Sequence, residues 1–409
     1  MSARREPRWD PASPEVQANP HPHLARLRDA GPIHRHLEAD GNVAWILTRH
    51  VDCAALLRDP SWSAAKFPAS VLATVAADPQ APFSVVARTA LHMMLLKDGA
   101  DHARLRTLVN KAFTPRVVAE LRPRVQAIAD ELLDAAAGRG EFDAIGDLGM
   151  PLPIIVIAEL FGVPLERHAD LKRWSDAIAT FLDGTIRAGG LAGAAAACLE
   201  MREYLDGLIA QRRAQPRTDL LSRLIAAREV GDQLSDDELF STVVLVLGAG
   251  HETTTNLIGN GLHALLRHPG ELAKLVARPE LIGPAIEELL RFEGPVTVTS
   301  RRPGAVAREL LGERIEPGQE VSLMLAGANR DPAVWTHPDR LDLARGDARH
   351  LAFGFGAHFC LGAALARLEA QIALGSAVAR FPNMKLADES PEWKPGIVLR
   401  GLRELWIRL

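Results

Sequence analysis

The ten residues Phe353-Gly-Phe-Gly-Ala-His-Phe-Cys360-Leu-Gly362 decide how this chain is interpreted. Gly354 and Gly356 can adopt backbone conformations barred to other residues, and they let a flat ligand approach the main chain. Cys360 comes directly before residues 361–381, whose apolar side chains have a helical spacing. A helix N-terminus favours the thiolate, because its N–H groups and its dipole stabilise negative charge. A thiolate beside an open, glycine-lined surface is what a haem iron needs as its proximal ligand.

Two other roles for Cys360 compete with this one. A lone cysteine is commonly a small buried apolar residue. His350 and His358 lie nearby and suggest zinc, but no second cysteine has the spacing of a structural zinc site. The glycines and phenylalanines around the sulfur favour the haem interpretation.

The pattern Phe353-x-x-Gly356-x-x-x-Cys360-x-Gly362 closely resembles the haem-binding loop of the cytochrome P-450 family. Further motifs in the same order extend the resemblance from about Pro20 to Leu409. The resemblance implies the cytochrome P-450 fold, which is mainly α, with one large helix-rich domain and a smaller β-rich portion. It also implies heme b (iron protoporphyrin IX), ligated by the Cys360 thiolate. The loop residues expected to contact the cofactor are Phe353, Gly354, His358, Cys360 and Gly362.

Composition limits the classes to which the chain can belong. Of its 409 residues 47% are apolar, enough for a sizeable core, and 47 basic against 51 acidic residues give a net charge of −4. That mild charge favours neither nucleic acid nor a membrane as partner. Three cysteines are too few for a disulfide framework and favour a reducing compartment. The N-terminus lacks signal-peptide features and no apolar run reaches about 20 residues, so we expect a soluble, cytoplasmic protein and a monomer.

The expected elements are helical, with short extended segments. Residues 33–37 and 43–47 alternate in polarity and predict a hairpin that turns at 40–42. From 100 to about 278 nearly every segment predicts helix, whereas 67–94 contains several prolines and predicts a long loop with broken helical pieces. Strands are expected again at 296–300, 314–315, 320–325 and 405–409.

No linker separates two globular halves of the sequence. We therefore expect an N-terminal arm at 1–20 and a single domain at 21–409.

Residues 240–267 predict a long helix with a defect in its middle. The first half is apolar on all sides and belongs in the core. Gly248 and Gly250 then cost about 1 kcal/mol each relative to alanine. Either they let a bound group press against the backbone, or they permit a close helix crossing. Residues 249–253, Ala-Gly-His-Glu-Thr, resemble the family's oxygen-binding helix. By that resemblance Ala249 contacts the cofactor, and Glu252 and Thr253 deliver protons to the oxygen.

A second charged motif follows this helix. Glu288-Leu-Leu-Arg291 places opposite charges at i,i+3 on one helical face, which is weak evidence by itself. It resembles the family's Glu-x-x-Arg element, with Arg340 as the third member. The resemblance implies a structural network that holds the cysteine loop.

The two haem propionates require cations or donors. His102 and Arg106 lie at i,i+4 on one helical face, which by itself indicates only a solvated basic surface. Their segment resembles the family's propionate-binding helix. By resemblance Arg301 and His358 are the other partners, and Arg302 remains an alternative to Arg301.

The resemblance implies a monooxygenase that inserts one oxygen atom from O2 into a C–H bond. The chain leaves no length for a flavin or iron–sulfur module, so electrons are expected from a ferredoxin or flavodoxin with its NAD(P)H-dependent reductase. Its expected docking surface contains Arg104, Lys111, Arg349 and Arg367. The expected substrate is an apolar small molecule: a terpenoid, steroid, fatty-acid derivative or polyketide. By resemblance, the residues that line its pocket are Val85, Val86, Leu245, Gly248, Ala249, Val296, Val298, Ile397 and Val398.

Three alternatives stay open, of which one keeps the fold but changes the outcome to desaturation or carbon–carbon coupling. A peroxygenase uses hydrogen peroxide and needs no electron donor, but relatives of that type typically lack the acid–alcohol pair present here as Glu252-Thr253. A non-catalytic haem sensor or binding protein would gain nothing from acid chemistry at oxygen.

Overall fold

A computed structural model describes residues 9–37, 42–65, 69–182, 190–229 and 232–409. The chain divides into two compact units, which we treat separately. Unit 1 comprises 1–63, 126–150 and 253–409, and unit 2 comprises 64–125 and 151–252. Of the predicted arm at 1–20, residues 1–8 lie outside the described residues, and the remainder contains the short helix α1 (Pro14–Ala18).

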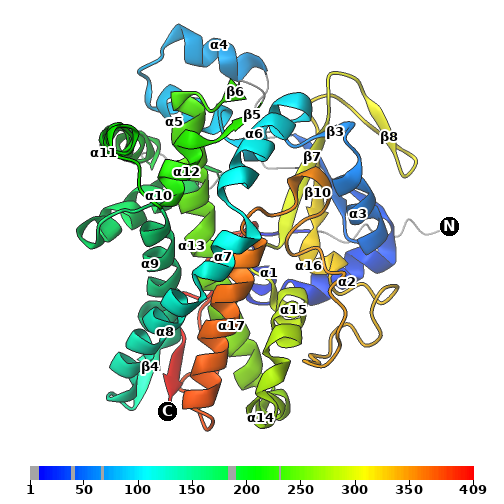
Figure 1. The fold of residues 1–409 in the computed structure, drawn as a ribbon. Coiled ribbons are helices and arrows are strands. Elements are labelled where there is room, and N and C mark those ends of the chain that lie inside the picture. The colour runs from blue at the N-terminus through cyan, green and yellow to red at the C-terminus, as the bar shows by residue number, and fades with distance from the viewer. Residues whose placement is uncertain (1–8, 38–41, 66–68, 183–189, 230–231) are drawn as a thin grey trace, which may run out of the picture. The chain divides into compact units, whose positions relative to one another are not determined.

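The main sheet of unit 1 has the strand order β1-β2-β10-β7-β3 (Figure 1). The predicted hairpin is confirmed, because β1 and β2 pair antiparallel with Ile33 opposite Leu47; part of its turn, 38–41, lies outside the described residues. The remaining pairs are β2 parallel to β10, and β10 and β3 each antiparallel to β7. The strands are β1 (Ile33–Leu37), β2 (Val43–Leu47), β3 (Trp62–Ser63), β7 (Val298–Pro303) and β10 (Glu320–Met324).

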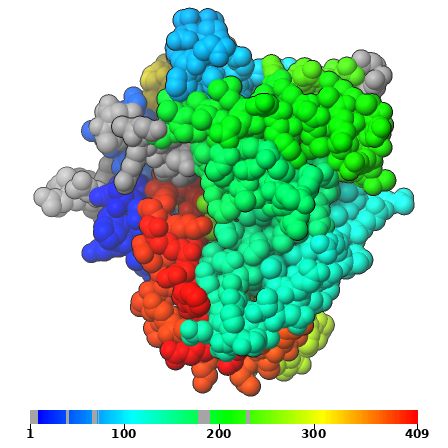
Figure 2. Space-filling model, turned by 90° about the vertical axis from the view of Figure 1, so that its left-hand side faces the viewer, coloured from blue at the N-terminus to red at the C-terminus, as the bar shows by residue number. Residues whose placement is uncertain are grey.

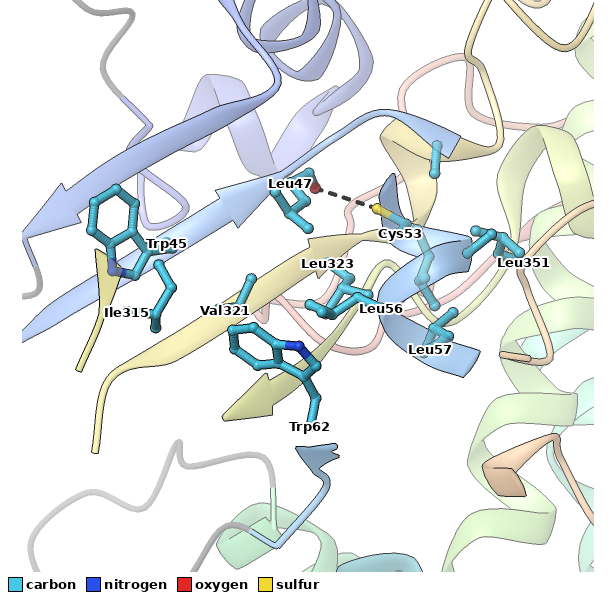
Figure 3. Close-up of a cluster of buried hydrophobic side chains, with 13 residues drawn as sticks. Trp45, Leu47, Cys53, Leu56, Leu57, Trp62, Ile315, Val321, Leu323 and Leu351 are labelled. Atoms are coloured by element: carbon cyan, nitrogen blue, oxygen red, sulfur yellow. Dashed lines mark hydrogen bonds between the residues drawn. The ribbon is translucent and has the colours of Figure 1, made fainter. Parts of the chain in front are cut away.

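Successive side chains of a strand point to opposite faces of the sheet. Here an apolar cluster covers each face. Trp45, Val321 and Leu323 lie in one apolar cluster, which Figure 3 shows with Cys53 and Leu57 of α3 packed against it. Ile46 and Met324, next to them in sequence, lie in a second cluster with Val298. The sheet thus forms the centre of the β-rich part of unit 1.

The helices of unit 1 pack against one another, and the cysteine loop immediately precedes α17. α15 and α17 are neighbours, and α16 contacts both α2 and α3. The helices are α2 (His21–Ala30), α3 (His50–Arg58), α14 (Pro269–Ala277), α15 (Ile282–Glu293), α16 (Leu325–Ala328) and α17 (Ala363–Arg380), with short helical turns at Ala144–Gly149, Pro279–Leu281 and Gly356–His358. The small strands are β4 (Glu141–Asp143), β8 (Arg308–Leu310), β9 (Glu313–Ile315), β11 (Lys385–Leu386) and β12 (Trp406–Arg408).

Unit 2 is almost entirely helical. Two helices continue from it into unit 1: α8 (Arg122–Ala137) and α13 (Asp236–Arg267). The others are α4 (Ala69–Ala77), α5 (Pro82–Leu91), α6 (Gly99–Ala112), α7 (Pro115–Glu120), α9 (Pro151–Leu160), α10 (His168–Leu182), α11 (Gly190–Ala214) and α12 (Leu220–Ala226), with short turns at Met94–Leu96 and Leu165–Arg167 and the two-stranded pair β5 (Arg228–Glu229) and β6 (Asp232–Gln233). Figure 2 shows α9, α10 and α11 as a teal-to-green surface.

The segment 67–94 was predicted as a long loop with broken helical pieces, and its described part, 69–94, contains two helices and more regular structure than expected. α4 and α5 occupy it, and α5 begins at Pro82. Proline is well suited to the first turn of a helix, where its missing N–H has no partner to lose. Pro82, one of the prolines that favoured a loop, therefore starts a helix.

The prediction of a mainly helical fold is confirmed, as is the long helix at 240–267, which begins four residues earlier. Among the described residues, no helix is both long and apolar enough to cross a membrane.

Candidate functional site

The cysteine loop of unit 1 is held by its own backbone. Gly354 and Gly356 have φ angles of +69° and +73°, a region that favours glycine. The Cys360 N–H donates to the Phe353 carbonyl oxygen at 2.9 Å, which closes the loop. A Cβ on Gly356 would lie 2.6 Å from the Leu57 carbonyl oxygen of α3. The sequence therefore needs glycine at 356 because the loop passes directly over α3.

Cys360 differs from the other two cysteines in its exposure. It is exposed, whereas Cys53 and Cys198 are buried. Burial raises the pKa of the Cys198 thiol to about 11 and that of Cys53 further still, so both remain neutral thiols near pH 7. Of the three cysteines, all of which lie in the described part of the chain, Cys360 is the one that is exposed.

The surroundings of Cys360 fit a flat apolar cofactor. Phe355 and Phe359 on the same loop are 37% and 40% exposed, and a Cβ on Gly362 would meet no atom within 4 Å. An exposed sulfur flanked by exposed rings and open space matches the needs of thiolate-ligated haem. The zinc alternative gains no support, because the described residues contain no group of three or more His, Cys, Asp or Glu side chains suited to a metal ion.

A buried charged network lies in the same unit. Arg291 donates to both carboxylate oxygens of Glu288, at 2.7 and 2.8 Å, and both side chains are almost fully buried. Arg291 also donates to the carbonyl oxygens of Asn329 and Pro338, at 3.0 and 2.7 Å. The Glu-x-x-Arg pair therefore anchors the chain that leads toward the cysteine loop.

The predicted third member of this network, Arg340, is wrong. Arg340 is exposed and contributes only its carbonyl oxygen, which accepts from Arg291 and Arg345. The guanidinium that reaches Glu288 belongs to Arg345, whose Nε lies 3.0 and 3.1 Å from the two carboxylate oxygens. A reversal of the chain between 336 and 345 brings Arg345 inward. We call Glu288, Arg291 and Arg345 the Glu288 cluster.

The two glycines of α13 have different surroundings. A Cβ on Gly250 would lie 3.2 Å from Ile157 Cδ1 of α9, which is the close helix crossing considered from the sequence. A Cβ on Gly248 would meet no atom within 4 Å, and Ala249 is exposed in the middle of an otherwise mostly buried helix. Gly248 and Ala249 thus form an exposed stretch of the helix surface. Glu252 and Thr253 follow it and are half-buried.

His251 is a member of this segment that the sequence interpretation left without a role. Its Nδ1 lies 2.9 Å from the Leu247 carbonyl oxygen, and its Nε2 lies 3.4 Å from Asp176 Oδ1 of α10. Burial alone would raise the pKa of Asp176, but hydrogen bonds from His251 and Lys172 outweigh it and lower that pKa. His251 therefore links α13 to an ionised carboxylate immediately before Glu252.

The propionate candidates of unit 2 lie on α6, in the predicted register. His102 is buried and Arg106 half-buried, one turn apart. Between them Arg104 donates to Glu238 of α13 and, at 3.3 Å, to Asp232. Arg104 therefore fixes α6 to the start of α13 within unit 2.

The two candidate arginines of β7 point to opposite faces of the sheet. Arg302 pairs with Glu320 of the neighbouring strand at 2.8 Å, and each side chain is 28% exposed. Arg301 is 5% exposed and donates to the Ser300 carbonyl oxygen at 2.8 Å. The strand geometry thus gives Arg302 a role within the sheet. His358, the remaining candidate, lies half-buried in the cysteine loop.

Two of the predicted pocket residues are in the core. Val86 is 1% exposed on α5, and Val298 is 7% exposed and packs in the second cluster of unit 1. Both belong to short apolar segments in which only every second or third residue can face a pocket. In unit 2, Val85 and Leu245 are half-buried; in unit 1, Val296 and Val398 are half-buried and Ile397 is exposed.

Hydrogen bonds join the two pocket segments of unit 1. The Thr297 hydroxyl donates to the Ile397 carbonyl oxygen, and the Thr297 N–H donates to the Val398 carbonyl oxygen at 3.0 Å. Asn260 of α13 donates to the carbonyl oxygens of Glu293 and Arg400 at 3.2 and 3.0 Å. Val296, Ile397 and Val398 therefore lie together beside the second half of α13.

Comparisons with known proteins place the chain. A family model for cytochrome P450 matches residues 191–399. Cytochrome P450 107B1 of Saccharopolyspora erythraea is 43% identical over 393 residues, 95% of this chain and 94% of the relative. The polyketide biosynthesis cytochrome P450 PksS of Bacillus subtilis is 38% identical over 409 residues, 98% of each chain. A solved structure of P450BioI in complex with hexadec-9Z-enoic acid ligated acyl carrier protein has a TM-score of 0.89 and 36% identity, and it covers 97% of this chain and 100% of the other.

The chain belongs to the cytochrome P450 family. It is a haem-thiolate monooxygenase, and its cofactor is heme b.

Proposed function

We propose that this enzyme inserts one oxygen atom from O2 into a C–H bond of an apolar small molecule, with electrons from a separate redox protein. The observation that carries the proposal is the exposed Cys360 on a loop shaped by Gly354 and Gly356. Haem bound through this sulfur supplies oxygen activation, which the thiolate promotes by donating electron density to the iron.

The protein's own residues hold the cofactor and handle protons. Cys360 is the metal ligand, and His102, Arg106, Arg301 and His358 are the proposed partners of the propionates. Arg301 is preferred over Arg302 because Arg302 is paired with Glu320. Glu252 and Thr253 are proposed to hold and transfer protons next to the exposed stretch at Gly248 and Ala249.

The substrate class is proposed from the site and from the named relatives. Ile397, Val398 and Val296 present aliphatic side chains without a charged anchor, which suits binding through desolvation. One relative is named for polyketide biosynthesis, and one solved relative carries a fatty acyl chain on an acyl carrier protein. A fatty-acyl or polyketide chain is therefore a proposed substrate, and a terpenoid or steroid stays an alternative, since another relative is named vitamin D(3) 25-hydroxylase.

A ferredoxin or flavodoxin, with its NAD(P)H-dependent reductase, is the proposed electron donor. Two of the arginines predicted to receive it are engaged within the protein. Arg104 pairs with Glu238, and Arg367 donates to Glu287 at 2.6 and 2.8 Å. Reversing their charge would disturb these pairs and would not report on docking. Arg349 donates to Asp347 at 2.6 Å, but its side chain is 65% exposed, so it is the residue to reverse, and Arg349→Glu is expected to slow haem reduction by the redox protein.

The absorption spectrum of the reduced, carbon-monoxide-treated protein tests the central assignment. Thiolate ligation gives the long-wavelength band near 450 nm, and Cys360→His is expected to abolish it while Cys198→Ser keeps it. A wild-type protein that binds haem without this band would contradict the proposal. Product formed equally well with peroxide alone would favour the peroxygenase, and bound haem with no turnover of any compound tried would favour a sensor.

A further inference from the structure

A second acidic side chain of α15, Glu287, lies next to Glu288 in the sequence and has its own partners in unit 1. Arg367 of α17 donates to Glu287 through Nε and one terminal nitrogen, at 2.6 and 2.8 Å. His350 Nε2 lies 3.1 Å from the same carboxylate. The Ala352 N–H donates to His350 Nδ1 at 3.3 Å, so Nδ1 is an acceptor. The ring proton is therefore on Nε2, which donates a hydrogen bond to Glu287.

The Glu287 carboxylate is ionised under all ordinary conditions. Burial alone would raise its pKa, but the hydrogen bonds from Arg367 and His350 outweigh burial and lower that pKa to about 2. Its side chain is 19% exposed and that of Arg367 is 29% exposed, so water screens the two charges only partly. Together they form a neutral pair made of two fixed opposite charges.

The pair lies against the first residue of the cysteine loop. The Arg367 guanidinium carbon is 4.4 Å from the centre of the Phe353 ring, a cation–π distance. His350 and Phe359 contact the same ring, with centroid distances of 6.1 and 6.3 Å. The Phe353 carbonyl oxygen in turn accepts the hydrogen bond from the Cys360 N–H. The Arg367–Glu287 pair is thus connected to Cys360 in two steps. Arg367 contacts the Phe353 ring, and the Phe353 carbonyl oxygen accepts from the Cys360 N–H.

We propose that the Glu287–Arg367 pair positions Phe353 and, through its balanced charge, sets the reduction potential of the iron bound at Cys360. Reduction adds one electron to the haem, so a nearby unbalanced positive charge favours the reduced form and a negative charge opposes it. The inference rests on the proposed role of Cys360 as metal ligand. Glu287, Arg367 and His350 are positioning residues in this account, because they act through Phe353.

The test is the midpoint potential of the haem-loaded protein, measured by spectroelectrochemistry without substrate. Glu287→Gln leaves the arginine charge unbalanced and is expected to raise the potential. Arg367→Gln leaves the carboxylate unbalanced and is expected to lower it. The double variant restores neutrality and is expected to lie between the two single variants. Opposite signs are the decisive result, because a pair that served only to stiffen the loop would shift both single variants in the same direction.

Two controls separate charge balance from other effects. Glu392→Gln and Arg403→Gln make the same formal charge changes at a pair of unit 1 that is exposed on both sides, and they are expected to leave the potential nearly unchanged. Arg367→Lys keeps the charge but loses the two-pronged contact, so it is expected to keep the potential near that of the wild type. If Arg367→Gln does not bind haem, Glu287→Gln decides alone: a potential that falls or stays constant overturns the proposal. Loss of the 450 nm band in the wild type would instead contradict the assignment of Cys360.

Discussion

The Glu288 cluster and the surface ion pairs of α10 and α11 are built from the same residue types. They differ in burial and therefore in what they contribute to the structure. In the Glu288 cluster, Arg291 is fully buried and its donors are used by a carboxylate and by backbone carbonyls from three places in the chain. On the surface of unit 2, Arg173 and Glu200 lie 2.6 Å apart, but each is about half exposed. Desolvated pairs are costly to break, whereas exposed ones contribute little. The buried charges therefore fix the path of the chain, and the surface charges do not.

The largest effect is expected at Arg291. Arg291→Ala leaves Glu288 buried with one remaining cation, Arg345, and removes a donor from the carbonyl oxygens of Asn329, Pro338 and Arg340, of which that of Arg340 still accepts from Arg345. Breaking a buried pair in this way costs about 3–5 kcal/mol. Denaturant unfolding of the haem-loaded protein measures the loss. A loss below about 1 kcal/mol would remove the distinction between the two regions.

A second buried cluster gives a pH dependence whose sign is fixed. Burial lowers the pKa of His21 despite its contact with Glu293. Burial alone would raise the pKa of Glu293, but the charges of His21, Arg400 and Arg330 hold it well below its usual range. Both groups bind fewer protons in the folded than in the unfolded protein. Their stabilisation is present above pH 6.5 and 4.5 respectively, and it is lost as the pH falls.

Glu293→Gln tests this cluster. We expect a loss of about 1.5–3 kcal/mol at pH 7, because Arg400 loses a charged acceptor at 2.6 Å. The same variant should lose less stability than the wild type between pH 5 and 3. Unfolding free energies measured across this range decide the matter, and parallel pH profiles for the two proteins would contradict the assignment.

The third prediction separates Arg345 from Arg340. Arg345→Ala removes one of the two cations of the Glu288 cluster. It also removes hydrogen bonds to the carbonyl oxygens of Thr336, His337 and Arg340. We therefore expect the free energy of unfolding to fall by about 1–3 kcal/mol. Arg340→Ala leaves the backbone carbonyl in place and is expected to cost less than about 0.5 kcal/mol. Denaturant unfolding measures the loss of stability in both variants. A larger loss for Arg340→Ala than for Arg345→Ala would restore Arg340 to the network.

Glu369 supplies a buried acid without a cation. It is 1% exposed on α17, its Oε2 has no hydrogen-bond partner, and burial raises its pKa well above the usual value. The folded protein therefore holds a proton that the unfolded chain releases above pH 4.5, so this residue reduces stability as the pH rises. Glu369→Gln is expected to add on the order of 1 kcal/mol at pH 8 and almost nothing at pH 4. A variant equally stabilised at both pH values would contradict this explanation.

The smallest effect is expected on the surface of unit 2. Arg173→Ala removes the contacts to Glu200 and Asp170, both of which are partly solvated. The change in unfolding free energy should stay within about 0.5 kcal/mol and shrink further in 0.5 M salt. A loss comparable to that of Arg291→Ala would show that exposure does not separate the two regions.

The local sequence alone was sufficient to predict the glycine-shaped cysteine loop and the long helix α13. In both, the residues that determine the geometry are neighbours in the chain: Gly354, Gly356 and Cys360 in one, Gly248 to Thr253 in the other. Arg345 could not be identified in this way, because its approach to Glu288 depends on how the chain reverses after Pro338. The choice between Arg301 and Arg302 depends on which face of β7 is covered, and that follows from the pairing with β10. Val86 and Val298 are buried, and their local sequence does not separate a core position from a pocket position, because an apolar residue fits either.

The pairing of β2 with β10 brings together segments far apart in the chain: Ala44 lies opposite Glu320. During synthesis at about 5–20 residues per second, the hairpin of β1 and β2 leaves the ribosome roughly 15–55 seconds before its neighbouring strand exists. For that interval β2 lacks the strand that pairs with it in the folded protein, so one of its edges carries unpaired backbone N–H and C=O groups. Capture of haem must wait longer still, because the cysteine loop is translated after β10.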